Sequence, residues 1–252
     1  MRICSLSPSA AGGSVAHRGG GDRTAGAPDS RALPIYLAWS GGKDCSLALH
    51  ALRADPRYRI THLLTTFADE YDRASMHGVR RELLRAQAAA AGLPLVEVGI
   101  PAPCPMGEYS RILGDAMRKA VEAGVAAVAY GDLFLEDVRA YREERLAEVA
   151  LDGVFPLWGS DTRTLAHRFI DLGFRARIVC VDTEQLDRSF IGRTIDRTLL
   201  AELPAGVDPC GENGEFHTFV WDAPFFERPV AHTVGHIEQR ERFVFQELHP
   251  GR

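Results

Sequence analysis

The feature of this chain that most restricts its fold is a regular alternation of short apolar segments with helical patterns, which begins at Ile35. The apolar segments are rich in β-branched residues, as strands are. They stand at 35–39, 61–67, 95–100, 125–130, 154–158 and 175–181, and the helical patterns at 44–54, 75–91, 108–123, 136–150 and 161–172. Strand–helix alternation at this spacing is typical of a parallel sheet with helices on both faces. The sequence therefore predicts an α/β fold with an open, mostly parallel, twisted sheet.

The helical predictions rest on the spacing of apolar residues. One stripe recurs at i, i+4, i+7 and i+11, and consists of Val79, Leu83, Ala86 and Ala90. A second stripe of the same kind runs through 112–121. Each stripe is expected to face the sheet. Gly92 and Gly124 follow these two patterns directly, and glycine just past a helix end is a common stop signal.

Composition divides the chain into three segments. Residues 1–34 are rich in Gly, Ala, Ser and Arg without periodicity, so we expect a disordered tail, with a targeting peptide or a misplaced start codon as alternatives. Residues 35–182 hold the strand–helix alternation and form the expected nucleotide-binding α/β domain. After Asp182 come a helical pattern at 188–203, a turn-rich loop at 204–219 and strand-like alternation at 230–248. Residues 183–252 are therefore predicted to form a smaller C-terminal substrate lobe.

Charge and cysteine content exclude several classes of protein. The net charge of -5 gives no overall attraction to a phosphate backbone, so nucleic acid is an unlikely partner and a small molecule a better one. The five cysteines include no CxxC pair, which argues against a zinc or iron–sulfur site. No apolar run reaches the roughly 18 residues of a membrane span. We expect a cytoplasmic protein without a membrane segment, and its C-terminal strands offer a sheet edge for homo-oligomer formation.

The turn Ser40-Gly41-Gly42-Lys43-Asp44 stands between the first predicted strand and the first predicted helix. In open parallel sheets, ligands bind where strand ends meet helix starts. Glycines let successive backbone N–H groups turn toward an anion, and the helix adds its positive end. Lys43 supplies a full positive charge, while Asp44 can cap the helix or help to hold Mg²⁺. The turn predicts a phosphate site; an ordinary tight turn with a helix cap is the alternative.

This turn resembles the fingerprint SGGxDS of the PP-loop ATP pyrophosphatases, which have a Rossmann-like fold. The match covers Ser40 to Asp44, with Cys45 in place of the usual hydroxyl residue and Ser46 next to it. The resemblance implies that ATP binds here and that AMP is transferred with release of pyrophosphate (PPi). No redox cofactor is implied.

A second motif narrows the resemblance to the diphthine–ammonia ligase-like branch of that superfamily. It lies in "DPCGENGEFHTFVWDAPFF" at 208–226, where Glu212, Gly214, Glu215, Thr218, Asp222, Pro224 and Phe226 match. Two positions depart from the family pattern: Asn213 replaces a glycine and His217 replaces a glutamate. The second exchange removes an obligate acceptor, so the sequence leaves open whether the substrate is diphthine.

The resemblance and the strand ends together give a set of expected site residues. The expected catalytic residues are Lys43, Glu212 and Glu215. ATP is expected to contact Ser40, Gly41, Gly42, Lys43, Asp44, Cys45, Ser46, Gly131 and Asp132, the last two because they follow a predicted strand. The substrate is expected to contact Asn213, Gly214, His217 and Thr218. Mg²⁺ is expected on Asp44.

The leading hypothesis is an AMP-forming ligase that adenylates a carboxylate, carried by a small molecule or by a protein, and amidates it with ammonia. Two alternatives stay open: a PP-loop enzyme that transfers sulfur to a tRNA base, and a nucleotide-binding regulatory module without turnover. Cys45 adds a third possibility, because a thiol at a helix N-terminus beside Lys43 would have a lowered pKa and act as a nucleophile.

Overall fold

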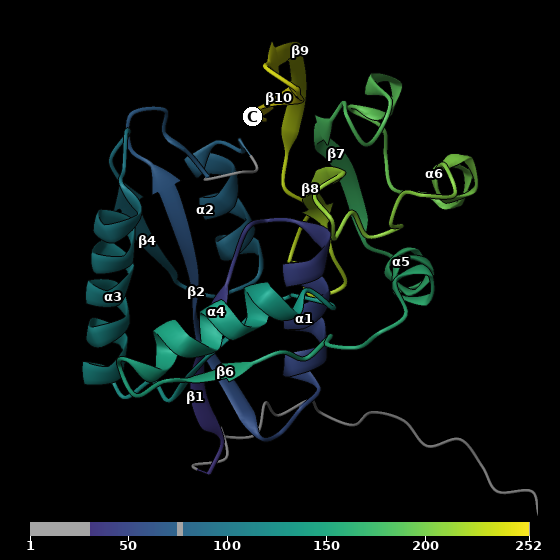
Figure 1. Ribbon diagram of the computed structural model, residues 1–252. Coiled ribbons are helices and arrows are strands. Elements are labelled where there is room, and N and C mark those ends of the chain that lie inside the picture. Colours follow the sequence, from purple (N-terminus) through teal and green to yellow (C-terminus); the bar gives the residue numbers. More distant parts are fainter. Residues whose placement is uncertain (1–30, 75–77, 252) are drawn as a thin grey trace, which may run out of the picture.

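The computed structural model describes residues 31–74 and 78–251, which form two sheets with helices around them (Figure 1). The predicted disordered tail at 1–34 falls almost entirely outside the described residues. In chain order the elements are β1 Leu33–Ala38, α1 Lys43–Arg53, β2 Tyr58–Ala68, β3 Arg73–Ala74, α2 Arg81–Ala90, β4 Leu95–Ile100, α3 Met106–Glu122, β5 Ala127–Ala129, α4 Glu136–Ala147, β6 Asp152–Val154, α5 Thr162–Asp171, β7 Arg175–Asp182, the 3₁₀ turn η1 Arg188–Phe190, α6 Arg197–Glu202, β8 Phe216–Asp222, β9 His232–Arg240 and β10 Phe243–Pro250.

The first sheet confirms the predicted parallel α/β fold. Strand β1 lies between β2 and β5, β4 pairs with β2, and β6 pairs with β5, all in parallel. Only the two-residue strand β3 is antiparallel to its neighbour β2. Parallel strands place their carboxyl ends on one edge, so the loops after β1, β2 and β5 converge there.

Both faces of this sheet are covered by helices, as predicted. Alternate residues of β1 divide between two apolar cores: Ile35 and Leu37 belong to the core that includes α1 and α2 residues, whereas Tyr36 belongs to the core on the α3 and α4 side. This division follows from the period of two along a strand. The apolar stripe of α3 buries Met117 and Ala120 against that second core. Gly92 and Gly124 end α2 and α3 with positive φ, as expected.

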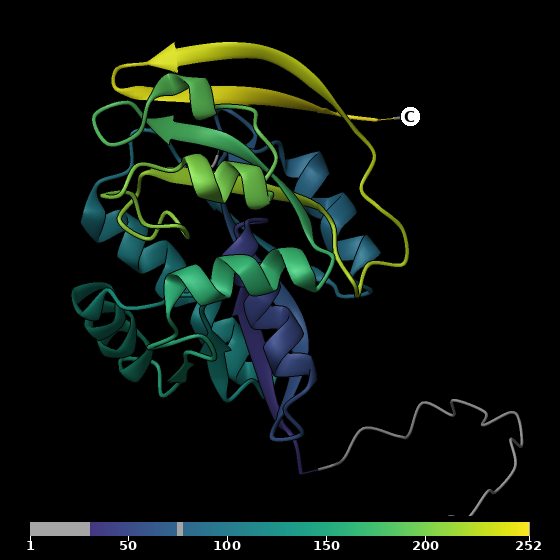
Figure 2. The ribbon, with the colours of Figure 1, turned by 90° about the vertical axis from the view of Figure 1, so that its right-hand side faces the viewer.

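The second sheet is antiparallel, with the strand order β8-β7-β10-β9 (Figure 2). Strand β7 was expected to continue the parallel sheet, and this expectation is wrong. Nearly all of β7 is buried, so its sequence lacks the polar alternation that marks many antiparallel strands. Because β7 belongs to the second sheet, we propose that the two lobes divide between β6 and α5, rather than at residue 182.

Several helical or strand predictions have wrong boundaries. Helix α2 begins at Arg81; residues 75–77 lie outside the described residues, and Val79 is buried ahead of the helix. Strand β6 ends at Val154, and the rest of the expected strand at 154–158 forms turns. The expected helix at 188–203 is only η1 and α6, because Gly192 takes a positive φ between them.

Gln87 on α2 joins the two lobes at the glycine turn. This side chain is fully buried, accepts a hydrogen bond from Trp39 Nε1 at 3.0 Å, and donates to the carbonyls of Gly41 and Val220 at 2.9 and 2.6 Å. Val220 on β8 also donates its backbone N–H to Gly41 O at 2.9 Å. One amide therefore connects the first sheet, the turn and the second sheet.

Replacing Gln87 with Leu is expected to lower the free energy of unfolding by about 2–4 kcal/mol, because the change leaves buried polar groups without a partner. Urea unfolding of the wild type and the variant measures this difference. Glu82→Gln, an exposed change on the same helix, serves as the control and should shift stability by less than about 0.5 kcal/mol. A Gln87→Leu protein as stable as the control would refute the joining role.

Candidate functional site

A cavity of about 770 Å³ lies at the carboxyl edge of the parallel sheet, between the two lobes. Its volume is within the range of roughly 300–1,000 Å³ that is common for small-molecule sites. The parallel lobe contributes the glycine turn, the ends of β2 and β5, and parts of α3 and α4. The antiparallel lobe contributes the 211–218 segment, the end of β7 and the turn between β9 and β10. A ligand here would touch both lobes at once.

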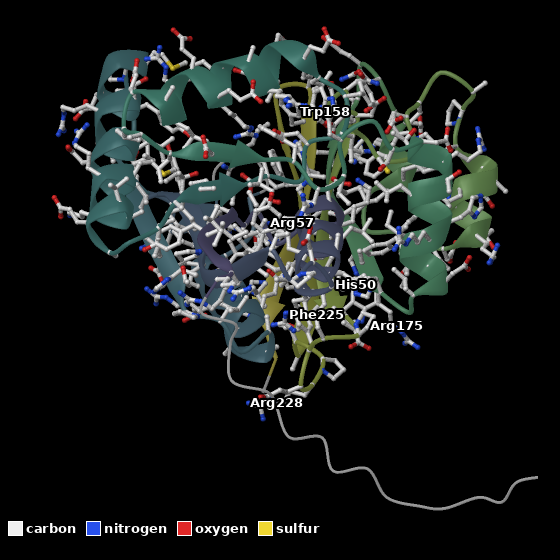
Figure 3. All side chains as sticks on the ribbon, turned by 90° about the horizontal axis from the view of Figure 1, so that it is seen from below. His50, Arg57, Trp158, Arg175, Phe225 and Arg228 are labelled. Carbon is white, nitrogen blue, oxygen red and sulfur yellow. The ribbon has the colours of Figure 1, made fainter. Side chains whose placement is uncertain are left out.

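The glycine turn opens onto this cavity at the N-terminus of α1. Gly41 has φ +78, a conformation that side chains disfavour, and a Cβ there would also lie 2.4 Å from Leu84 Cδ2. The hydroxyl of Ser46 donates to Gly42 O at 2.8 Å, which closes the first turn of the helix. Helix α1 then runs away from the cavity toward the face on which His50 lies (Figure 3). The His50 ring contacts Phe174 there. The positive end of α1 therefore faces the cavity.

Backbones approach the turn closely on two sides, at Gly131 and at Gly42. A Cβ on Gly131, just past β5, would lie 2.8 Å from the backbone carbon of Asp44. A Cβ on Gly42 would lie 3.2 Å from the carbonyl oxygen of Thr218 on β8. The Thr218 hydroxyl accepts a hydrogen bond from the backbone N–H of Lys43 at 3.0 Å. The turn is thus held between β5 and β8.

Lys43 is the buried cation of the site, with its side chain 2 % exposed. Its Nζ donates to both carboxylate oxygens of Asp44 at 2.8 Å and to the carbonyl of Cys210. Burial by itself lowers the pKa of Lys43, but the facing Asp44 carboxylate, together with Cys210 and Glu212, outweighs it and raises the pKa overall. The ammonium group therefore stays charged at the cavity wall.

The 208–218 loop carries the acidic residues of the second motif, and hydrogen bonds within it fix its shape. Asp208 accepts from the backbone N–H of Cys210 at 2.8 Å, and its own N–H donates to Glu215 Oε1 at 2.8 Å. Asn213 Nδ2 donates to the same oxygen at 3.1 Å. Glu215 Oε2 is buried without a hydrogen-bond partner among the described residues. Glu215 thus stabilises the loop by accepting hydrogen bonds from two of its residues.

Glu212 lies on the cavity wall and reaches across to the parallel lobe. Its Oε1 accepts a hydrogen bond from the backbone N–H of Leu133 at 2.7 Å. Burial, with a smaller contribution from the Asp44 carboxylate, raises the pKa of Glu212 to about 7. A carboxyl group with this pKa exchanges protons readily near neutral pH.

Burial also shifts the pKa values of His217 and of two thiols in the site. Burial, together with the Lys43 ammonium, lowers the pKa of His217 to about 4. Burial raises the pKa of the Cys45 thiol, and raises that of Cys210 to about 12. The expectation of a lowered pKa for Cys45 is therefore wrong, because burial outweighs the helix end. Its Sγ donates to Gly42 O at 3.1 Å, as part of the turn.

The structure brings most of the expected site residues together at the cavity. Those that line it are Ser40, Gly42, Lys43, Asp44, Cys45, Gly131, Asp132, Glu212, Asn213, Gly214, His217 and Thr218. Gly41, Ser46 and Glu215 lie behind this wall: Gly41 faces Leu84 and Gln87, Ser46 is fully buried under the turn, and Glu215 holds the loop. Contact of these three with a ligand stays a prediction.

Several cavity residues were not expected from the sequence. Thr65 and Thr66 stand near the carboxyl end of β2, and Asp182 ends β7, so the strand-end rule that found Gly131 would also have found them. Tyr109, Gln185, Arg242 and Phe243 come from a helix, from turns and from the start of β10. Nothing in their local sequence marks them. Only the packing of the second sheet places Arg242 and Phe243 here.

The described residues offer Mg²⁺ no preformed site. They contain no group of three or more His, Cys, Asp or Glu that could hold a metal ion, and both oxygens of Asp44 accept from Lys43. Mg²⁺ is often held by one or two carboxylates together with substrate phosphates, a site that forms only with the substrate. Asp44 as a metal ligand therefore stays a prediction.

Comparison with known proteins agrees with this geometry. A family model of the diphthamide synthase N-terminal domain matches residues 35–151, and one of the diphthamide synthase C-terminal domain matches residues 161–246. The chain belongs to the diphthamide synthase family. The first match contains most of the parallel sheet, and the second contains most of the antiparallel sheet.

Individual relatives are similar at modest identity. A diphthine–ammonia ligase of Danio rerio is 28% identical over 213 residues, 76% of this chain and 83% of the relative. One of Homo sapiens is 31% identical over 102 residues, 38% of each chain. One of Schizosaccharomyces pombe is 27% identical over 111 residues, 42% of this chain but 18% of the relative. The match thus spans less than two thirds of the human and yeast relatives.

Within residues 31–74 and 78–251, none of the helices has both the length and the apolar character that crossing a bilayer requires. The predictions of a cytoplasmic location and of homo-oligomer formation stay predictions.

The raised pKa of Glu212 predicts how stability depends on pH. The native protein holds this proton more tightly than the unfolded chain, where the pKa of Glu is about 4.3. The resulting stabilisation is complete below that value and is lost as pH rises through about 7. The stability of the wild type relative to Glu212→Gln should therefore fall between pH 5 and 7 and then level off.

Urea unfolding at each pH measures this difference. Glu227→Gln, which changes an exposed carboxylate outside the cavity, should show no such fall. The raised pKa would be contradicted if the stability of the wild type relative to Glu212→Gln stayed constant or increased with pH.

Proposed function

We propose that this protein is an ATP-dependent, AMP-forming ligase that activates a carboxylate as its adenylate and amidates it with ammonia. The observation that supports the proposal best is the shared cavity: the glycine turn at the end of β1 and the acidic 208–218 loop form facing walls of one space. Membership of the diphthamide synthase family supports the same reaction. The named activity of the relatives is ammonia ligation to diphthine.

ATP would lie along the parallel-lobe wall. Ala38, Leu64, Leu113, Met117 and Tyr130 give that wall an apolar part suited to a base, and the glycine turn gives it a part suited to phosphates. In the first step a substrate carboxylate oxygen attacks the α-phosphorus, the bond to the β-phosphate breaks, and PPi leaves. Lys43 and the N-terminus of α1 stabilise the negative charge in this step.

The second step needs a base. Ammonia is mostly ammonium at neutral pH, and nitrogen must lose protons as it attacks the acyl carbon and AMP leaves. Glu212 has a pKa of about 7 and lines the cavity, so it can accept a proton and release it again at neutral pH. We assign Glu212 as the general base and Glu215 as the residue that positions its loop. When bound, Mg²⁺ would neutralise phosphate charge.

The direct test is to incubate the protein with ATP, Mg²⁺, ammonium and a library of carboxylic acids. The expected result is release of AMP and PPi, with an acid converted to its amide as seen by mass spectrometry. ATP binding without PPi release for any acid would contradict the ligase and support a regulatory module instead.

Removing the Lys43 charge is expected to lower kcat/KM for PPi release by about 100-fold or more, because a fixed cation at the phosphates is lost. Lys43→Met alone leaves Asp44 as an unpaired, partly buried carboxylate. The double variant Lys43→Met/Asp44→Asn removes both charges. A loss of activity in this variant therefore does not come from an unpaired carboxylate that destabilises the fold. Wild-type turnover in a folded double variant would remove Lys43 from the mechanism.

Glu212→Gln is expected to separate the two steps. Adenylation does not need the base, so exchange of labelled PPi into ATP should stay within a few-fold of the wild type. Amide formation should fall by about 100-fold or more. Glu227→Gln is the matched control and should change neither rate. An equal loss of both rates in Glu212→Gln would contradict its assignment as the base.

A further inference from the structure

A second cavity, of about 310 Å³, is separate from the first, and the two share no lining residue. Its walls come from the end of α1 and the loop after it, the start of β2, helix α4, and the segment that ends β6 and follows it. Its volume is at the lower end of the range for small-molecule sites. None of the steps proposed above involves this cavity, so its lining indicates what it could bind.

The charged residues that line this cavity are two arginines and one aspartate: Arg57, Arg139 and Asp55. Arg57 already engages both carboxylate oxygens of Asp55, with Nε donating at 3.0 Å and Nη2 at 2.6 Å. The backbone N–H of Arg57 donates to Asp55 as well, at 3.0 Å. The carboxylate therefore has little capacity left to bind a cation, and the lining favours a negatively charged ligand.

Arg139 has hydrogen-bond donors to offer such a ligand. A guanidinium group carries five N–H donors. In Arg139, Nε donates to Glu143 at 2.8 Å, and within residues 31–74 and 78–251 neither Nη group has an acceptor. The edge between the two Nη groups matches the paired oxygens of a carboxylate or phosphate. Glu143 and an added anion would use different edges of the guanidinium, so both can bind at once.

Aromatic rings restrict the position of the Arg139 guanidinium. Its Cζ lies 4.8 Å from the ring centroid of Phe155 and 4.7 Å from that of Trp158. The Phe155 ring in turn stacks on the buried Tyr130, with 5.7 Å between the ring centroids. Contacts of this kind leave the N–H groups in the guanidinium plane free to donate. The donors are thus partly ordered before a ligand binds, which lowers the entropic cost of binding.

The other side chains of the lining are mainly apolar. Ala51 and Leu52 come from α1, and Val154 and Pro156 lie at the end of β6 and after it. The rings of Tyr58 and Phe155 also line the cavity. A ligand that combines one anionic group with a small apolar body would match both parts of this surface.

We propose that this cavity is a second binding site, for a small organic anion whose carboxylate or phosphate binds the free Nη edge of Arg139. Arg57 adds a second positive charge at the rim, where its side chain is 75 % exposed. The site lies outside the proposed ligase machinery and does not depend on that reaction.

Fluorine NMR of protein labelled with 5-fluorotryptophan tests the proposal, because the three tryptophans of the chain lie in different places. Trp158 contacts Arg139, Trp39 lines the first cavity, and Trp221 lies on β8. Replacing each tryptophan with Phe in turn assigns its signal. The probes are benzoate and phenyl phosphate, with benzamide as the uncharged isostere of benzoate. We expect a saturable shift of the Trp158 signal with at least one anion, and at least about tenfold weaker binding of benzamide than of benzoate or phenyl phosphate.

Arg139→Gln is expected to weaken binding of the anion at Trp158 by at least about tenfold, because the paired donors and the charge are lost. The tighter of the two anions identifies the charged group that the site prefers. Arg111→Gln is the matched control: it changes an exposed arginine on α3 that is also paired with a carboxylate on its own helix, and it should bind like the wild type. Thermal unfolding establishes that both variants are folded.

The proposal is overturned if neither anion shifts the Trp158 signal saturably, or if benzamide binds as tightly as the anions. Unchanged binding in a folded Arg139→Gln protein would also overturn it. A shift of the Trp39 signal alone would place the anion in the first cavity and refute a second site.

Discussion

The packing of β8 against the glycine turn is the interaction on which the site depends. Val220 donates to Gly41 O, the Thr218 hydroxyl accepts from Lys43 N, and Gln87 bonds to both sides of the contact. The turn cannot take a side chain at Gly41, where a Cβ would collide with Leu84 and Gln87. The same contact that fixes the proposed phosphate site therefore also sets the position of the second sheet and its loop.

Burial then determines the charge state of the cavity. It favours neutral forms, so Glu212 is more easily protonated and His217 less easily protonated than in water. The pKa of Lys43 is raised despite its burial, chiefly because Asp44 lies 2.8 Å away. The result is a buried cation at the turn, while Arg142 and Arg242 elsewhere on the cavity wall are paired with Asp132 and Asp182. The buried cation at the turn suits the proposed binding of the ATP phosphates there.

The sequence predicted the elements and site residues that depend on neighbouring residues. It predicted less well the features that depend on contacts between distant parts of the chain. Strand β1, the turn and α1 follow each other directly, and the motif placed Lys43 and Glu212 at the cavity. Strand β7 was assigned to the wrong sheet because a strand buried on both faces has the same pattern in either kind of sheet. Glu215 was expected at the ligand, but spacing alone does not tell which of two nearby glutamates points inward.

The sequence by itself determined the α/β fold, the glycine turn and the polar residues that follow it, because strand and helix periods and the need for glycine are properties of neighbouring residues. Only the tertiary structure decided which groups face one another across the cavity. Gln185, Arg242 and Phe243 reach it through the pairing of β7 with β10, and the shifted pKa values of Glu212 and His217 come from burial. Both depend on contacts between residues far apart in the chain, which no local pattern records.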